Sequence, residues 1–254
     1  MPFYAGGIGV YYIENTSTDA AFNLALEQHL FDTFPDDLFM LWRNSNAVIV
    51  GIHQDTASEI NEAFIDDNNI TVVRRLSGGG AVFHDLGNLN FTIITHAPDN
   101  AELDFRVYCR PIIDALAALG INASASGGND ISVGDKKISG NAWYLRNGRL
   151  MHHGTILFDT DIEKMENALN VPEQKLASKG IKSVRARVIN IRELLDRDMS
   201  TGDFIAFLRG HLIDALCLEP HTLSTADLAA AEALRKKRYA TRKWNYGVSP
   251  NTCL

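Results

Sequence analysis

The most informative segment of the sequence is Arg74-Arg75-Leu76-Ser77-Gly78-Gly79-Gly80-Ala81-Val82-Phe83-His84-Asp85-Leu86-Gly87-Asn88. Consecutive glycines are costly in backbone entropy unless the loop needs positive φ or the close approach of a ligand. Successive N–H groups in such a loop form an anion nest, and a neighbouring arginine can pair bidentately with phosphate or carboxylate. With Arg75 beside Gly78, Gly79 and Gly80, the stretch predicts a phosphate-binding loop between two strands. A tight surface turn with a solvated basic pair is the alternative.

The hydrophobic pattern on either side of this loop predicts a mixed sheet. Strands are expected at residues 10–14, 38–43, 47–51, 71–75, 88–95, 131–133, 137–144 and 150–158, the one at 88–95 half-buried. Helices are expected after Asp19, as the N-cap, and at residues 59–66, 105–119, 162–169, 202–216 and 226–239. Because several strands run consecutively in the middle of the chain, we expect an α/β (α+β) fold with a mixed, largely antiparallel central sheet flanked by helices.

The overall composition limits the function. The 254 residues are 46% apolar and 22% charged, which excludes a disordered or fibrous chain. A net charge of −7 argues against nucleic-acid binding, and no apolar run is long enough to cross a bilayer. The 3 cysteines lack CxxC spacing, so neither a disulfide framework nor a zinc site is expected. Since the N-terminus carries no basic targeting signal, we expect a cytoplasmic protein without a membrane partner.

Three further segments offer charged or metal-binding side chains. Lys136 and Lys137 alternate on a strand, so one can point inward to a phosphate or carboxylate; an exposed turn lysine is the alternative. Asn129-Asp130 can supply a carboxylate to Mg²⁺ held with a triphosphate, or be only a turn. His152 and His153 alternate faces and cannot chelate one ion, so one buried and one exposed histidine are expected.

The chain has neither a P-loop nor a dinucleotide-binding fingerprint. Its motifs instead closely resemble the lipoate–protein ligase A group of the biotin/lipoate ligase catalytic-domain family. The likeness extends over about residues 10 to 250 and combines the glycine stretch with a lysine motif that follows it in order. The matching segments are residues 39–44, residues 74–88, Lys137-Ile138-Ser139-Gly140, His152-His153-Gly154-Thr155 and residues 175–188.

This resemblance implies a two-step reaction. Lipoate attacks the α-phosphate of ATP, with Mg²⁺ as cofactor, to give lipoyl-AMP and pyrophosphate. The lipoyl group then passes to a lysine of a lipoyl domain, such as those of 2-oxoacid dehydrogenase E2 subunits and the glycine cleavage H protein. The resemblance makes Lys137 the catalytic residue, because its ammonium group binds both the nucleotide phosphate and the lipoate carboxylate.

The remaining candidate residues surround these two substrates. The expected ATP-binding residues are Arg75, Gly78, Gly79, Gly80, Ala81, Val82, Phe83, Asn129, Asp130 and Lys137. Asp130 is also the candidate metal ligand. The expected lipoate-binding residues are Leu41, Val82, His84, Lys137, Gly140 and His153.

The resemblance also sets expectations for domain organisation and for alternatives. Residues 1–245 are expected to form the catalytic domain and residues 246–254 a C-terminal tail. Bacterial ligases usually carry a C-terminal accessory domain that this sequence lacks, so a large subunit that needs a separate accessory subunit is one alternative. An ATP-independent octanoyl/lipoyl transferase ranks second, because it needs a reactive thiolate and Cys109 lies in an apolar helical pattern while Cys217 and Cys253 lie far along the chain. Biotin ligation ranks third, because its glycine-arginine loop differs.

Overall fold

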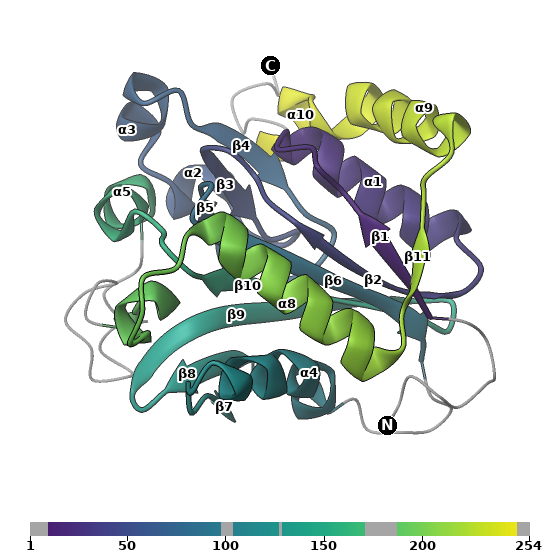
Figure 1. Cartoon of the computed structure of the whole chain (residues 1–254). Helices are drawn as coiled ribbons and strands as arrows, with labels where there is room; N and C mark the ends of the chain where they lie inside the picture. The colour runs from purple at the N-terminus through teal and green to yellow at the C-terminus, as the bar shows by residue number, and fades with distance from the viewer. Residues whose placement is uncertain (1–9, 98–103, 127–128, 171–186, 248–254) are drawn as a thin grey trace, which may run out of the picture.

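A large mixed sheet forms the centre of the structure, a computed structural model that describes residues 10–97, 104–126, 129–170 and 187–247. The strands of this sheet are β1 (Val10–Glu14), β2 (Asp37–Trp42), β6 (Asn88–His96), β7 (Ser124–Ser126), β8 (Asp130–Val133), β9 (Lys136–Arg146), β10 (Arg149–Leu157) and β11 (Glu219–His221). Their order among the described residues is β11-β1-β2-β6-β10-β9-β8-β7 (Figure 1). β1 pairs with β11 and β2 in parallel, and the other neighbours are antiparallel. The predicted fold class is confirmed.

A smaller sheet carries the strands on both sides of the glycine stretch. Its described strands are β3 (Ala47–Val50), β4 (Thr71–Arg74) and β5 (Val82–His84), with β3 in the middle. The sequence predicts β2 and β3 as successive strands, but not that they belong to different sheets. The reason lies in their connection, where Asn44 is fully buried and accepts a hydrogen bond from Asn23 at 2.9 Å. The connection is therefore fixed to the helix that follows β1.

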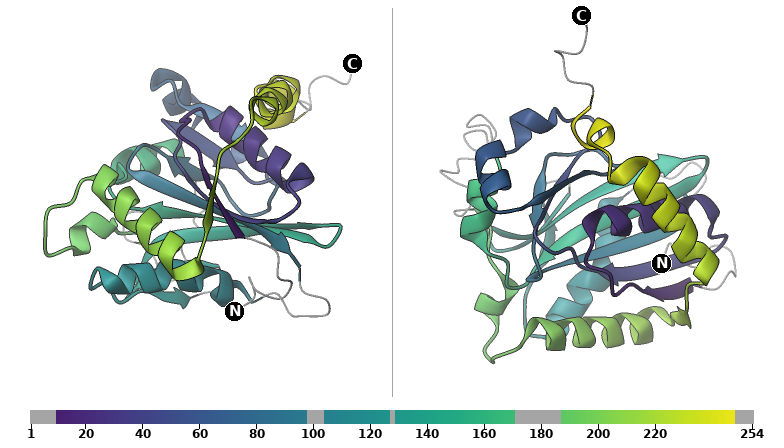
Figure 2. Two further views of the ribbon diagram at one scale, coloured as in Figure 1. Left: turned by 45° about the vertical axis from the view of Figure 1, so that its right-hand side comes forward. Right: turned by 90° about the horizontal axis from the view of Figure 1, so that it is seen from above.

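Helices cover both faces of the large sheet (Figures 1 and 2). α1 (Ala20–Thr33) and α9 (Thr225–Leu234) lie on one face, and α4 (Phe105–Ala118) and α8 (Thr201–Leu216) pack on the other. Asp19 caps α1 as predicted. The shorter helical segments are α2 (Thr56–Glu59), α3 (Glu62–Asp67), α5 (Ile162–Ala168), a 3₁₀ turn at Ile191–Leu194, a π turn at Arg235–Tyr239 and α10 (Arg242–Tyr246). None of the helices in the described ranges is long and apolar enough to span a membrane.

The central strand β6 is buried on both faces because helices cover the sheet on both sides. Phe91 and Ile93 belong to the core beneath α4 and α8. On the opposite face, Thr92 donates a hydrogen bond to Glu27 of α1 at 2.7 Å. The prediction of a half-buried strand is therefore wrong. Here the alternation of polar and apolar residues separates a polar interior from an apolar one, and both lie away from solvent.

Two tight turns join β8, β9 and β10 into a meander. Gly134 adopts φ 59°, and Asn147 and Gly148 adopt φ 52° and 74°, as their turn-forming dipeptides predict. The meander brings the lysine motif at the start of β9 beside the histidine motif in β10. The two motifs thereby lie on neighbouring antiparallel strands.

Arg74 fastens the C-terminal helix α10 to the small sheet. Its Nη1 donates to the carbonyls of Gly51 and Gln54 at 2.9 and 2.7 Å, and its Nη2 donates to Thr56 Oγ1 at 2.6 Å. Its Nε donates to the carbonyl of Trp244 at 3.0 Å. The side chain is only 7% exposed, so this guanidinium has a structural role.

We expect Arg74→Met to lower the free energy of unfolding by about 3 kcal/mol, because several buried carbonyls lose a charged donor at once. Denaturation in urea measures the change. The control is Arg110→Met on the exposed side of α4, where one ion pair with Asp114 is lost and the expected change is under about 0.5 kcal/mol. Equal stabilities for the two variants would contradict the structural role.

Candidate active site

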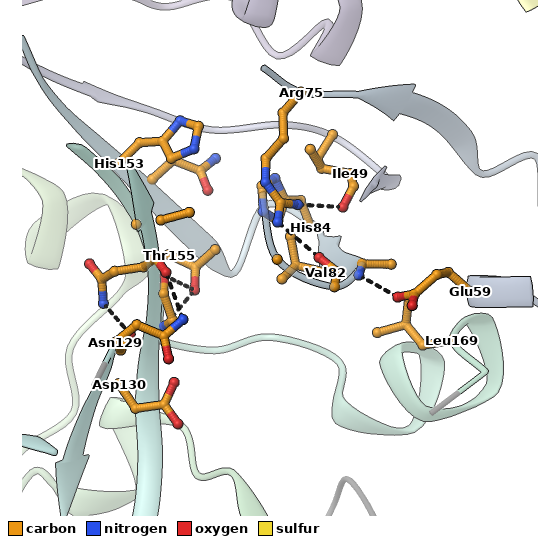
Figure 3. A pocket seen from close by; sticks show the side chains of 18 of the residues that line it. Ile49, Glu59, Arg75, Val82, His84, Asn129, Asp130, His153, Thr155 and Leu169 are labelled. Atoms are coloured by element: carbon orange, nitrogen blue, oxygen red, sulfur yellow. Dashed lines mark hydrogen bonds between the residues drawn. The ribbon is translucent and has the colours of Figure 1, made fainter. Parts of the chain in front are cut away.

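A cavity of about 410 Å³ lies between the two sheets. Figure 3 shows its walls, with His153, Thr155, Asn129 and Asp130 on one side and Arg75, Ile49, Val82 and His84 on the other. The glycine loop between β4 and β5 lines it as well. The cavity thus brings together the glycine stretch, the lysine motif and the histidine motif.

The guanidinium of Arg75 lies inside the glycine loop and holds its shape. Its Nη2 donates to the carbonyls of Gly78 and Gly80 at 2.6 and 2.9 Å. Its Nη1 donates to the carbonyl of Ile49 at 3.0 Å, and its Nε donates to Ser77 Oγ at 3.0 Å. Arg75 lines the cavity, but most of its donors bind the loop rather than point at a ligand.

Two nearby carboxylates stabilise the positive charge of the buried Arg75 guanidinium. Burial lowers the pKa of Arg75 to about 10, and the nearby carboxylates of Glu27 and Glu59 oppose that shift, so the side chain stays charged at neutral pH. Glu59 also accepts a hydrogen bond from the backbone N–H of Ala81 at 2.7 Å. The far end of the glycine loop is therefore held by an acidic side chain from α2.

The glycines are required where the backbone passes close to its neighbours. Gly79 adopts φ 95°, and a Cβ there would lie 2.9 Å from Arg75 Nη2. A Cβ at Gly51 would lie 1.9 Å from the carbonyl oxygen of Gly79. Positive φ and close approach are the reasons that the sequence suggested, although the close neighbours found here are parts of the protein itself.

A buried hydrogen-bond chain connects the loop to the large sheet and to α1. Ser77 Oγ lies 2.6 Å from His153 Nε2, and His153 Nδ1 lies 2.8 Å from Glu27 Oε1. Thr92 donates to the same Glu27 oxygen and accepts a hydrogen bond from Trp42 Nε1 at 2.8 Å. Ser77 is 1% exposed and does not line the cavity, so the chain positions the loop and His153.

Lys137 forms the cationic end of the cavity. Its Nζ lies 2.7 Å from Asp130 Oδ1, and Arg187 Nη2 lies 2.6 Å from Asp130 Oδ2. Burial raises the pKa of Asp130, but the two cations outweigh burial and lower it overall. A Cβ at Gly140 would lie 2.6 Å from Lys137 Nζ, so this glycine leaves room for the ammonium group. Lys137 lines the cavity and Lys136 does not.

Apolar side chains line another part of the cavity, namely Leu24, Trp42, Ile49 and Val82. Two residues expected at a ligand point elsewhere. Leu41 packs in the core beneath α4 and α8, and Phe83 packs in a core beside the small sheet. Neighbouring side chains on a strand face opposite ways, so Trp42 takes the cavity position that was assigned to Leu41.

The other predicted residues are mostly brought together. Those that line the cavity are Arg75, Gly79, Gly80, Ala81, Val82, His84, Asn129, Asp130, Lys137, Gly140 and His153. Gly78 lines a neighbouring hollow of about 270 Å³ instead. Sequence reasoning gave no role to Glu27, Glu59, Asn90 or Arg187. Arg187 lies in the matching segment 175–188, and no local motif singles out the other three. Residues 127–128, most of the matching segment 175–188 and Cys253 lie outside the described residues.

Both histidines of the His152-His153 motif are buried, with 1% and 7% exposure, so the expectation of one exposed histidine is wrong. The face occupied by His152 is covered by α4, and its ring packs against Phe105 and Phe91. Burial there lowers the pKa of His152 to about 3, so it is neutral at physiological pH. Only His153 faces the cavity.

The fold and the cavity agree with the family assignment from sequence comparison. The model of the lipoyl protein ligase A/B catalytic domain matches residues 19–213. The chain belongs to this family.

Individual relatives show which members of the family this chain is similar to. The chain is 42% identical to lipoate–protein ligase 1 of Staphylococcus aureus (strain Mu50) over 238 residues, which are 93% of this chain and 73% of that protein. It is similar to the bi-partite lipoate protein ligase of Thermoplasma acidophilum, studied with its E2 lipoyl domain, with 27% identity, a TM-score of 0.81 and coverage of 97% and 100%. It is also similar to lipoate-protein ligase A bound with ATP, with 26% identity, a TM-score of 0.78 and coverage of 94% and 98%.

We expect Arg75→Lys to loosen the glycine loop, because one ammonium group cannot reach the carbonyls on both sides of the turn. Hydrogen exchange at residues 78–81 should become faster, and the free energy of unfolding should fall by about 2 kcal/mol. The control is Arg43→Lys, because the Arg43 guanidinium makes one exposed hydrogen bond, to the Leu86 carbonyl at 3.1 Å. Unchanged exchange in Arg75→Lys would show that the loop holds its shape without the guanidinium.

Proposed function

We propose that this chain is an ATP-dependent lipoate–protein ligase. It activates lipoate to lipoyl-AMP and transfers the lipoyl group to a lysine of a lipoyl-domain protein. The observation that carries the proposal is one cavity that combines an apolar part, a glycine loop and the ammonium group of Lys137. Membership of the ligase family and 42% identity to a lipoate–protein ligase support the same activity.

In the first step, a carboxylate oxygen of lipoate forms a bond to the α-phosphorus of ATP, and pyrophosphate leaves. Two anions must approach each other, and Lys137 lies where its charge reduces their repulsion and stabilises the transition state. In the second step, the acceptor amine attacks the acyl carbon, AMP leaves and the amine loses a proton. Much of the rate enhancement comes from holding the reactants in line.

The substrates divide the cavity between them. We assign the phosphates of ATP to the glycine loop, with Asn129 and Lys137 nearby and Arg75 holding the loop from within. We assign the lipoate tail to the apolar part, beside Trp42, Val82, His84 and His153. An apolar slot with few polar groups is the usual construction of a small-molecule site.

Magnesium has a limited place in the proposal. No cluster of three histidine, cysteine or acidic side chains suited to a metal occurs among the described residues. Both carboxylate oxygens of Asp130 already pair with cations, so the residues present do not fit a site that the protein builds for Mg²⁺. Mg²⁺ would enter as the counter-ion of the triphosphate, whose oxygens it binds well.

The acceptors follow from the same reaction. The Thermoplasma ligase was studied with an E2 lipoyl domain, which supports E2 subunits of 2-oxoacid dehydrogenases as acceptors, with the glycine cleavage H protein as another candidate. That ligase is bi-partite, which supports a separate accessory subunit for this chain as well. In this proposal residues 1–245 are the catalytic domain and residues 246–254 a tail, and the reaction takes place in the cytoplasm.

We expect Lys137→Ala to reduce lipoate-dependent pyrophosphate release at least about a hundredfold, because the cation between the two reacting anions is lost. Pyrophosphate is measured with lipoate and MgATP, and lipoylation is then measured on a lipoyl-domain acceptor. The control is Lys136→Ala, since Lys136 is adjacent in sequence but does not line the cavity. Turnover of Lys137→Ala like that of the unmodified protein would remove Lys137 from the mechanism.

The transferase alternative depends on a cysteine. Cys109 is fully buried and its burial raises the pKa of its thiol, while Cys217 is exposed; neither lines the cavity. A Cys217→Ser/Cys253→Ser variant should keep ligase activity and react with a thiol reagent only after unfolding. Rapid native labelling of Cys109 with loss of acyl transfer, or octanoyl transfer without ATP, would favour the transferase.

A further inference from the structure

Two buried polar side chains that line the cavity carry a nitrogen atom with no hydrogen-bond partner among the described residues. These atoms are Nε2 of His84 and Nδ2 of Asn90. The two side chains are 3% and 2% exposed, and both line the cavity. Buried polar groups are nearly always paired, so two unpaired ones in side chains that line the same cavity point to a ligand with a matching atom.

A chain of amides fixes the proton of His84. Asn23 Nδ2 lies within 3.0 Å of three oxygen atoms, namely the carbonyls of Ser17 and Arg43 and Oδ1 of Asn44. Asn44 Nδ2 then lies 3.0 Å from His84 Nδ1 and donates to it. Burial lowers the pKa of His84 to about 3, so the ring is neutral. Its single proton is therefore on Nε2, which makes this atom an N–H donor.

Asn90 is the second donor. It lies on β6, paired in register with Trp42 of β2 and Thr155 of β10, and all three line the cavity. Asn88 donates to Asn90 Oδ1 at 2.9 Å, and the amide nitrogen of Asn90 has no partner among the described residues. Val82, which occupies the same side of β5 as His84, and the Trp42 ring supply apolar surface to the cavity.

The spacing across the sheet places Asn90 at the far end of a lipoate molecule. The Lys137 ammonium lies over Gly140 on β9. The backbone N–H of Gly140 donates to Thr155 Oγ1 on β10 at 3.2 Å. Asn90 is one strand further, on β6, and two inter-strand steps span about 10 Å. A lipoate molecule whose carboxylate meets Lys137 carries its sulfur atoms about 8 Å away along its chain.

We propose that His84 and Asn90 donate hydrogen bonds to the sulfur atoms of the lipoate dithiolane and so select lipoate over plain fatty acids. This inference rests on the proposed function and adds its acyl specificity. A hydrocarbon tail would leave both donors unpaired. The free-energy cost of burying an unpaired donor exceeds the strength of a hydrogen bond to sulfur, which is a weak acceptor. The Trp42 ring supplies a favourable sulfur–aromatic contact at the same place.

The test compares three acids of similar length: lipoate, octanoate and 5-cyclopentylpentanoate, which has the shape of lipoate with carbon in place of sulfur. Adenylate formation is followed as acid-dependent pyrophosphate release with hydroxylamine as the trap. In the unmodified protein we expect kcat/KM for lipoate to exceed that for the carbon analogue by about tenfold. Octanoate should resemble the carbon analogue.

The variants separate the donors from the shape of the cavity. His84→Asn keeps an acceptor for Asn44 but removes the donor at the ε position, and Asn90→Leu removes the second donor with a side chain of the same branching. In each, the preference for lipoate over the carbon analogue should fall to within about threefold. His84→Gln is the matched control, because its amide nitrogen reaches the ε position and the preference should remain.

The outcomes are distinguishable. No pyrophosphate release with any of the three acids would overturn the proposed function itself. Activity with all three and no preference for lipoate in the unmodified protein would overturn only this inference. An equal loss for all three acids in His84→Asn and Asn90→Leu would show that the donors hold the carboxylate instead of the sulfur atoms, and this also overturns the inference.

Discussion

The geometry of the cavity depends on the buried guanidinium of Arg75. It binds the carbonyl oxygens of Gly78 and Gly80 from inside the turn, and because the peptide unit is planar, each fixed carbonyl also fixes the N–H of the same unit. The φ of 95° at Gly79 is the bend that lets the backbone pass around this group. The direction of the loop amides is thus set by the protein, so a bound anion does not have to organise them.

The same charge makes the two sheets depend on each other. Arg75 comes from the small sheet, and its partner Ser77 is hydrogen bonded to His153 of the large sheet. His153 in turn contacts Glu27 of α1, whose carboxylate helps to keep Arg75 charged. A buried polar network of this kind is stable only when all of its members are paired, since each unpaired member carries its full desolvation cost. The loop, the strand and the helix are therefore arranged as one unit.

Local sequence was sufficient to predict most strands and helices and the position of the glycine loop between two strands. Strand alternation predicted that one of Lys136 and Lys137 points inward, and the family resemblance identified it as Lys137. An error of one residue, however, assigned Leu41 to the position that Trp42 occupies. The burial of β6 and of His152 could not be read from alternation, because it depends on helices that are distant in sequence. For the same reason the partner of His153, 126 residues earlier, carried no local signal.

Arg187 explains how the lysine can change partners. In this structure the carboxylate of Asp130 is shared, with Lys137 on one oxygen and Arg187 on the other. When a phosphate or carboxylate enters the cavity, it competes with Asp130 for the lysine ammonium. If Lys137 were the sole partner, its departure would leave a buried carboxylate unpaired, which is strongly unfavourable. Because Arg187 can keep its ion pair, Asp130 stays neutralised and Lys137 is available to the ligand. The second cation, which a reading of the lysine motif alone does not suggest, makes the first one usable.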